Sequence, residues 1–338
     1  MKPIPRISVI MSIYKEPESW IRLSVDSILG QTVADFEFII INDNPSRPEN
    51  DALLLEYQQK DARIRVIRNA ENLGLTRSLN LGLQAAHGAY IARMDADDFA
   101  FPERFAVQLE YLQEHPDCIA CSGLAYSWDG SNVTGKMYRP VGYPEMLYYS
   151  FTSSPFVHPL LMMRREFLEK ANIRYDENFR YSQDYKLAVD LLKVGKIGNV
   201  DRYLLKYRIS AQQITSKFGR EQTDLTTRIR RELIDWYYAK FALPTLHPVI
   251  SIDTLRENYR YTKAVCSDGR LTASQKQEFR TTMNCIRRLL YYSLSEYSWS
   301  SLWLFLKSGD YFCIPYKFRR FIIIILKHFR ATIVPRLL

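Results

Sequence analysis

The sequence has no run of about 18 uncharged apolar residues, the length that a membrane-spanning helix needs. Its N-terminus does not resemble a secretory signal peptide, because the apolar stretch is short and Pro3 and Pro5 interrupt its start. Cysteine is scarce, and the five residues at irregular spacing fit a reducing cytoplasm better than a disulfide framework. We therefore expect a cytoplasmic protein without a membrane span.

Incomplete motifs exclude three further classes of protein. Cys118 and Cys121 form a C-x-x-C without a second pair, so we expect two small buried side chains on a strand rather than a zinc site. The turn "SIYKEPES" contains no glycine, which excludes the G-x-G-x-x-G of a dinucleotide-binding fold. The segment "DADDFAFPERFA" lacks the glycine and glutamate that a calcium loop places at set positions.

What the chain does contain is an alternation of short apolar and amphipathic segments through its first 130 residues. Apolar, β-branched composition predicts strands at 6–12, 36–42, 64–69, 89–95 and 117–127. Helical spacing of apolar residues predicts helices at 19–31, 75–88 and 102–115. This order predicts an α/β fold with a mixed, mostly parallel sheet flanked by helices, followed by a C-terminal helical region.

Polar side chains follow three of the predicted strands. Ligands of open α/β sheets bind at the carboxyl ends of the strands, so we expect these side chains to share one edge. They are Ser12 and Tyr14 after the first strand, Asp43 after the second, and Asp95, Asp97 and Asp98 after the fourth. Three carboxylates within four residues repel one another, which favours a site that binds a cation.

The sequence D-x-D after a strand also occurs in phosphatases of the haloacid dehalogenase type. In those enzymes the first aspartate is the nucleophile, and the motif normally lies on the first strand, followed by Thr or Val. Here it lies on the fourth predicted strand and is followed by Asp98 and Phe99. An Asp95-nucleophile phosphatase therefore stays open as the weaker alternative.

Three blocks of the sequence resemble family 2 glycosyltransferases with the GT-A fold. They are "ISVIMSIYKEPESWIRLSVDSILGQTVADFEFIIINDN", "NLGLTRSLNLGLQAAHGAYIARMDADDFAFPERF", and "DYKLAVDLLKVGKI" followed by "YLLKYRISAQQIT". The resemblance extends from residue 5 to about 218 in the order of the family. It is greatest to bacterial enzymes that extend O-antigen or capsular polysaccharide repeats.

The resemblance implies a reaction and a set of donor-binding residues. The family moves a sugar, usually from a UDP-linked donor, to a hydroxyl group with inversion, and Mn²⁺ or Mg²⁺ stabilises the leaving diphosphate. By this resemblance Asp97 binds the metal and Asp95 contacts the donor. Asp98 either orients the donor sugar or caps the helix that starts near Pro102.

Nucleotide contacts also follow from the resemblance. Asp43 matches the residue that contacts uracil, although Asn42 replaces the more usual first aspartate of that motif. Ser12 and Tyr14 match positions that line the base pocket. Arg77 matches a position near the diphosphate, where Arg68 and Arg93 are rival candidates.

Acceptor-side residues come from the later blocks. Asp184 matches the catalytic base, with Gln183 in a place where a glutamate is more usual. His158 matches a histidine near the acceptor. Ser210 stands where many members carry a histidine, which in some of them completes the metal site, so a third protein ligand is in doubt.

We therefore expect a catalytic domain over 1–218, with a nucleotide-binding half at about 1–130 and an acceptor half at about 131–218. Residues 201–338 hold 24 Lys and Arg against 11 Asp and Glu, and the last 28 residues contain no acid. The predicted helical region 219–338 thus favours contact with an anionic membrane surface over nucleic acid. A lipid-linked saccharide acceptor would fit this location, at the inner face of the bacterial cytoplasmic membrane. A membrane-associated sugar-nucleotide-binding protein without transfer activity stays open as the alternative.

Overall fold

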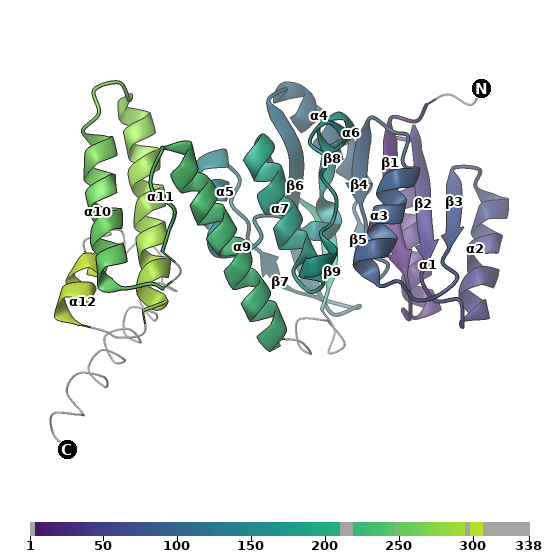
Figure 1. The fold of residues 1–338 in the computed structure, drawn as a ribbon. Helices are drawn as coiled ribbons and strands as arrows, with labels where there is room; N and C mark the ends of the chain where they lie inside the picture. The colour runs from purple at the N-terminus through teal and green to yellow at the C-terminus, as the bar shows by residue number, and fades with distance from the viewer. Residues whose placement is uncertain (1–3, 210–218, 248, 295–297, 307–338) are drawn as a thin grey trace, which may run out of the picture. The chain divides into compact units, whose positions relative to one another are not determined.

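The computed structural model describes residues 4–209, 219–247, 249–294 and 298–306 (Figure 1). The chain forms two compact units, Met1–Ile229 and Arg230–Leu338. The boundary between them falls within one helix, α9 (Gly219–Lys240). The predicted boundary at residue 218 and the basic segment 311–338 lie outside the described residues.

The N-terminal half of the sheet is parallel, as the alternation of strand and helix predicts. β1 (Ile7–Ile13) pairs with β2 (Phe36–Asn42) and with β4 (Tyr90–Arg93), and β2 pairs with β3 (Ile64–Arg68). Every residue of β1 and β2 is buried, because helices cover both faces of these central strands (Figure 1). The connecting helices are α1 (Glu18–Leu29), α2 (Pro48–Lys60) and α3 (Leu75–Ala85).

The second half of the sheet introduces antiparallel pairs. The strand order is β3-β2-β1-β4-β8-β6-β9-β5, with β7 (Val133–Met137) paired to β6 (Cys118–Trp128). The short strand β8 (Met162–Arg164) is antiparallel to both β4 and β6. The long strand β9 (Lys196–Arg208) is parallel to β6 and antiparallel to β5 (Phe99–Ala100). The sheet is therefore mixed, which confirms the predicted GT-A-like architecture.

Helices of the second half complete the first unit. They are α4 (Arg104–Glu114), α5 (Tyr143–Ser150), α6 (Arg165–Lys170) and α7 (Gln183–Val194). α4 packs on β6 and β9, and α7 packs on β9. Both Cys118 and Cys121 are buried on β6, as expected for small apolar side chains, and burial raises the pKa of the Cys118 thiol to about 11.

The second unit is helical, as predicted. It contains the end of α9, then α10 (Ile252–Cys266), α11 (Ala273–Tyr292) and α12 (Trp299–Leu306). Capping boxes at Ser251 and Thr272 begin α10 and α11. No helix within the described ranges is long and apolar enough to cross a bilayer.

Candidate functional site

The carboxylate after β2 belongs to a closed hydrogen-bond cluster. Asp43 is 2% exposed, and its Oδ1 accepts hydrogen bonds from Asn69 Nδ2 at 2.7 Å and from the Leu73 amide at 2.8 Å. Its Oδ2 accepts a hydrogen bond from the Gly74 amide at 2.9 Å. Gly74 has a φ of 81°, a conformation that glycine adopts readily, and α3 begins at the next residue. Asp43 therefore fixes the loop that leads into α3.

In the loop after β1, hydrogen bonds hold the backbone of Tyr14 while its ring is partly exposed. The carbonyl oxygen of Tyr14 accepts hydrogen bonds from Asn44 Nδ2 at 3.0 Å and from Asn50 Nδ2 at 3.2 Å. Its amide donates to Glu16 Oε2 at 2.6 Å. Ser12 is buried at the end of β1, whereas Tyr14 is 36% exposed. The phenol ring is thus available for stacking against a planar group.

The three aspartates after β4 have different surroundings. Arg93 is buried and pairs through Nη2 with Asp95 Oδ1. Among the described residues Asp97 forms no such pair, and burial together with the negative charges of Asp95 and Glu16 raises its pKa to about 7. The loop therefore holds more negative charge than the neighbouring arginines neutralise.

Asp98 does not cap the following helix, so that alternative is wrong. The N-cap of α4 is Glu103, and no side chain caps this helix. Asp98 is 1% exposed, and its Oδ1 accepts a hydrogen bond from the Arg208 amide at 2.8 Å. Its Oδ2 is buried without a hydrogen-bond partner among the described residues. Burial, and then the charges of Asp97 and Asp95, raise the pKa of Asp98 well above its usual value.

The predicted base lies in the first turn of α7. Burial raises the pKa of Asp184, the charge of Asp95 raises it further, and backbone amides and Arg139 act in the opposite direction. The contribution of Asp95 to the raised pKa of Asp184 indicates that these two carboxylates are close enough to interact electrostatically. Gln183 is 7% exposed, and its Oε1 has no hydrogen-bond partner in the described part of the chain.

Two residues that the sequence analysis missed lie within this group of carboxylates. Glu16 follows β1, and burial and the charge of Asp95 raise its pKa. Tyr207, near the end of β9, is surrounded by charges from both sides of the site. Burial raises its pKa first, and four carboxylates raise it further: Asp95, Asp98, Asp97 and Asp184. Both residues lie within the blocks that carry the family resemblance, but the charges around them become apparent only in the fold.

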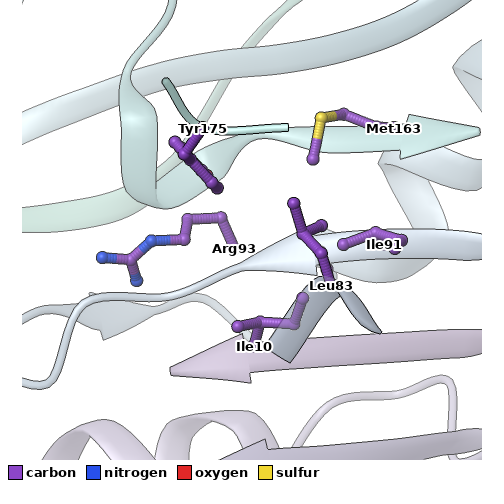
Figure 2. Close-up of a pocket in the computed structure, with 7 residues that line it drawn as sticks. Ile10, Leu83, Ile91, Arg93, Met163 and Tyr175 are labelled. Carbon is purple, nitrogen blue, oxygen red and sulfur yellow. The ribbon is translucent and has the colours of Figure 1, made fainter. Parts of the chain in front are cut away.

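His158 contacts Tyr175, one of the residues that line an apolar pocket. Its Nε2 is 2.8 Å from the hydroxyl of Tyr175, and burial and the nearby Arg93 lower the pKa of His158 to about 3. Figure 2 shows Tyr175 and Arg93 at one end of the pocket and Met163 at the other, with the guanidinium pointing away from the apolar side chains. The pocket has no room for a water molecule, which makes it a packing feature rather than a ligand site.

Arg77 takes part in a surface ion pair. Arg77 is on the exposed side of α3, where its Nε pairs with Glu177 Oε2 at 2.7 Å. A diphosphate would have to compete with this surface ion pair. Ser210 lies outside the described residues.

The donor set of the site suits a hard divalent cation. Carboxylate oxygens are the ligands that Mn²⁺ and Mg²⁺ prefer, and burial, followed by the negative charges of Asp95 and Glu16, raises the pKa of Asp97. Within the described residues, however, no group of three or more acidic, histidine or cysteine side chains has the geometry of a complete metal site. The residues therefore fit a cation that takes its other ligands from water or from a bound phosphate group.

The chain is similar in sequence to known glycosyltransferases. Residues 8–171 match the family described as glycosyl transferase family 2. An uncharacterized glycosyltransferase of Methanocaldococcus jannaschii is 35% identical, over 69% of this chain and 78% of its own length. The amylovoran biosynthesis glycosyltransferase AmsE of Erwinia amylovora is 25% identical, over 63% of this chain and 79% of its own length.

Solved structures share the fold. S. aureus TarS in complex with UDP-GlcNAc has a TM-score of 0.57 at 15% identity, covering 90% of this chain and 89% of that one. The mannosyltransferase PcManGT from Pyrobaculum calidifontis, in complex with GDP-Man and Mn²⁺, has a TM-score of 0.54 at 15% identity, covering 96% and 81%. At this level of identity the likeness concerns the arrangement of strands and helices.

Proposed function

The chain belongs to glycosyl transferase family 2, and we propose that it is an inverting, metal-dependent enzyme of bacterial surface polysaccharide synthesis. It moves a sugar from a UDP-sugar to a hydroxyl group of a lipid-linked saccharide. The observation that carries the proposal is that Tyr207 at the end of β9 lies near both groups: burial raises its pKa first, and the charges of Asp95 and Asp184 raise it further. A candidate base on α7 and the candidate donor-binding loop after β4 thus belong to one site.

The donor is bound at the ends of β1, β2 and β4. Tyr14 stacks on the base, beside Ser12, and Asp43 supplies the carboxylate oxygen that meets the base. Among the described residues Asp43 Oδ2 accepts one hydrogen bond, which supports this role because a carboxylate oxygen can accept a second. Asp95 and Asp98 contact the donor sugar, and Arg77 exchanges its partner Glu177 for the diphosphate.

Asp97 holds Mn²⁺ or Mg²⁺, which when bound stabilises the negative charge of the leaving diphosphate. The raised pKa of Asp97 and of Asp98 supports a cation at this loop. The structural neighbour from Pyrobaculum calidifontis, whose complex contains Mn²⁺, gives further support.

Asp184 accepts the proton of the acceptor hydroxyl as that hydroxyl attacks C1 of the donor sugar. The raised pKa of Asp184 suits this role, because a more basic carboxylate is a better proton acceptor, provided that it is ionised at the working pH. The hydroxyl attacks from the face opposite the leaving UDP, so an α-linked donor gives a β-linkage. Gln183 and His158 keep the acceptor-side roles that the sequence resemblance assigns to them.

The proposed class of acceptor is supported by a relative in polysaccharide synthesis and by the positive charge of residues 311–338. AmsE is a glycosyltransferase of amylovoran biosynthesis, which supports a role in polysaccharide assembly. Six basic residues and no acid in 311–338 support attachment at the inner face of the cytoplasmic membrane, where a lipid-linked saccharide is accessible. The full set of basic residues is Lys317, Arg319, Arg320, Lys327, Arg330 and Arg336.

A donor panel tests the proposal. The purified full chain is incubated with UDP-sugars and GDP-sugars, with and without Mn²⁺, and with a lipid-diphosphate-sugar acceptor. We expect one UDP-sugar to release UDP and to form a β-linked product only when Mn²⁺ or Mg²⁺ is present. Nucleotide binding without any product would instead support a binding protein without transfer activity. Release of inorganic phosphate through a covalent Asp95 intermediate would support the phosphatase alternative.

A further inference from the structure

Arg208 is a buried arginine held by two indole rings. It ends β9 and is 4% exposed. The ring centroids of Trp20 and Trp128 each lie 4.2 Å from its Cζ atom. Trp20 comes from the first turn of α1 and Trp128 from the end of β6, so three elements distant in sequence meet at this guanidinium. Stacking of this kind restricts the plane of the guanidinium.

The same residue makes two hydrogen bonds to the loop after β4. Its backbone amide donates to Asp98 Oδ1 at 2.8 Å, and its Nε donates to the carbonyl oxygen of Asp97 at 2.7 Å. One bond holds an acidic side chain, and the other holds the backbone from which the Asp97 carboxylate projects. Arg208 therefore restrains the loop at two successive residues.

Gly130 leaves room for the guanidinium group of Arg208 because it has no side chain. Gly130 has a φ of 107°, and a Cβ atom at this position would lie 2.5 Å from Arg208 Nη1. A larger residue in this turn would displace the guanidinium. The turn between β6 and β7 (Val133–Met137) therefore forms part of the arginine's surroundings.

We infer that Arg208, held by Trp20 and Trp128, is a positioning residue that sets the direction of the Asp97 carboxylate toward the metal and the nucleotide diphosphate. The inference rests on the proposed function of this site. It requires an arginine, because lysine offers neither an Nε donor nor a planar cation that stacks between rings. A purely structural arginine would stabilise the fold without linking metal binding to nucleotide binding.

The test compares Arg208→Lys with Arg164→Lys in the full chain. Arg164 is a matched control, because its Nε also donates to a backbone carbonyl, that of Cys118 at 3.0 Å, and its Cζ lies 5.6 Å from the ring centroid of Tyr90. Calorimetry measures the affinity for UDP and for GDP at increasing Mn²⁺, and thermal unfolding measures stability. Loss of one charge-assisted hydrogen bond corresponds to about a tenfold change in affinity or more.

We expect Mn²⁺ to strengthen nucleotide binding by the wild-type protein and by Arg164→Lys. In Arg208→Lys this gain falls about tenfold or more, while binding without metal is retained. If Arg208→Lys does not fold, Trp20→Leu removes one ring and leaves the arginine in place, and it should reduce the gain in the same direction by a smaller factor.

Three results would overturn the inference. The increase in nucleotide affinity that Mn²⁺ causes could be unchanged in Arg208→Lys, it could fall equally in Arg164→Lys, or it could be absent from the wild-type protein. Failure of the proposed function is a separate result. In that case no donor in the panel gives product, although Mn²⁺ still increases the nucleotide affinity of the wild-type protein and fails to do so in Arg208→Lys.

Discussion

The Nε2 atom of His158 lies 2.8 Å from the hydroxyl oxygen of Tyr175, and both groups are neutral near pH 7. Burial, and then the charge of Arg93, lower the pKa of the imidazole to about 3, and burial raises the pKa of the phenol. This pair lies beside Arg93, the residue that pairs with Asp95. Protonation of His158 would place a second positive charge there.

The neutral His158 makes stability dependent on pH. In the unfolded chain a histidine has a pKa near 6.5, so between about pH 6.5 and 3 the unfolded state binds a proton that the folded state excludes. The stabilisation is fully present above about pH 6.5 and is lost as the pH falls toward 3. Denaturant titrations at several pH values give the free energy of unfolding as a function of pH. In this window the slope of that plot should be shallower for His158→Gln than for the wild-type protein, by up to about 1.4 kcal/mol per pH unit.

His115→Gln serves as the control for that titration. His115 is exposed at the end of α4, away from Arg93 and Tyr175. Its replacement should leave the slope unchanged. Equal slopes for His158→Gln and the wild-type protein would show that the imidazole is protonated as readily when folded as when unfolded.

Asp184→Asn should lower kcat by about 100-fold or more, because general-base assistance contributes about 10² to 10⁴ in rate. Nucleotide affinity should be retained, since the proposed role concerns the acceptor hydroxyl. Asp190→Asn is the matched control on the same helix. Asp190 pairs with Lys186 at 2.7 Å and Lys193 at 3.4 Å, and its replacement should retain activity. A fully active Asp184→Asn enzyme would exclude this residue as the base.

Asp43→Asn should lower the free energy of unfolding by about 1–3 kcal/mol, measured by denaturant titration. The amide group of asparagine would turn an N–H donor toward Asn69, Leu73 or Gly74, each of which already donates to this carboxylate. Asp35→Asn is the control, because Asp35 is exposed and accepts one 3.3 Å hydrogen bond from the Arg6 amide. A similar small loss in both variants would mean that the Asp43 cluster contributes little.

Removing three positive charges from the tail should weaken binding to anionic vesicles. Each basic residue near such a surface contributes about 1 kcal/mol, so Lys317, Arg319 and Arg320 replaced by Gln should give roughly 100-fold weaker binding to phosphatidylglycerol-containing vesicles in sedimentation assays. The control replaces three exposed lysines of the first unit: Lys60, Lys136 and Lys170. Equal binding by both variants would remove the tail from the proposal.

Much of the first unit follows from local sequence. β1 and β2 are short, apolar and buried at every position, and their exits can be located from the polar residues that follow them. Amphipathic spacing likewise locates α1 and α3. The spacing of apolar residues does not predict α2, and the short strands β5, β7 and β8 show no clear pattern in the sequence. A strand of two or three residues has too few side chains to show a period.

The partners of the site residues could not be predicted in this way. Arg208 and Asp97 are separated by 111 positions, and their hydrogen bond depends on the pairing of β9 with β5 and β6. For Asp98, two local readings were available, a ligand or a helix cap. The fold excluded the cap, because α4 begins only at Arg104 and the carboxylate is already bound to the Arg208 amide. Glu16 and Tyr207 lie within the blocks that resemble the family, but nothing in the local sequence shows that the aspartates of the site surround them.

The position of the antiparallel strand β8 has a consequence for how the two halves of the first unit fold. It comes from the later part of the chain but lies between β4 and β6, while β5 from the earlier part pairs with β9. The two halves are therefore interleaved in one sheet, and cutting the chain at about residue 130 would leave strands of both fragments without their partners. We therefore expect the two halves to fold only together.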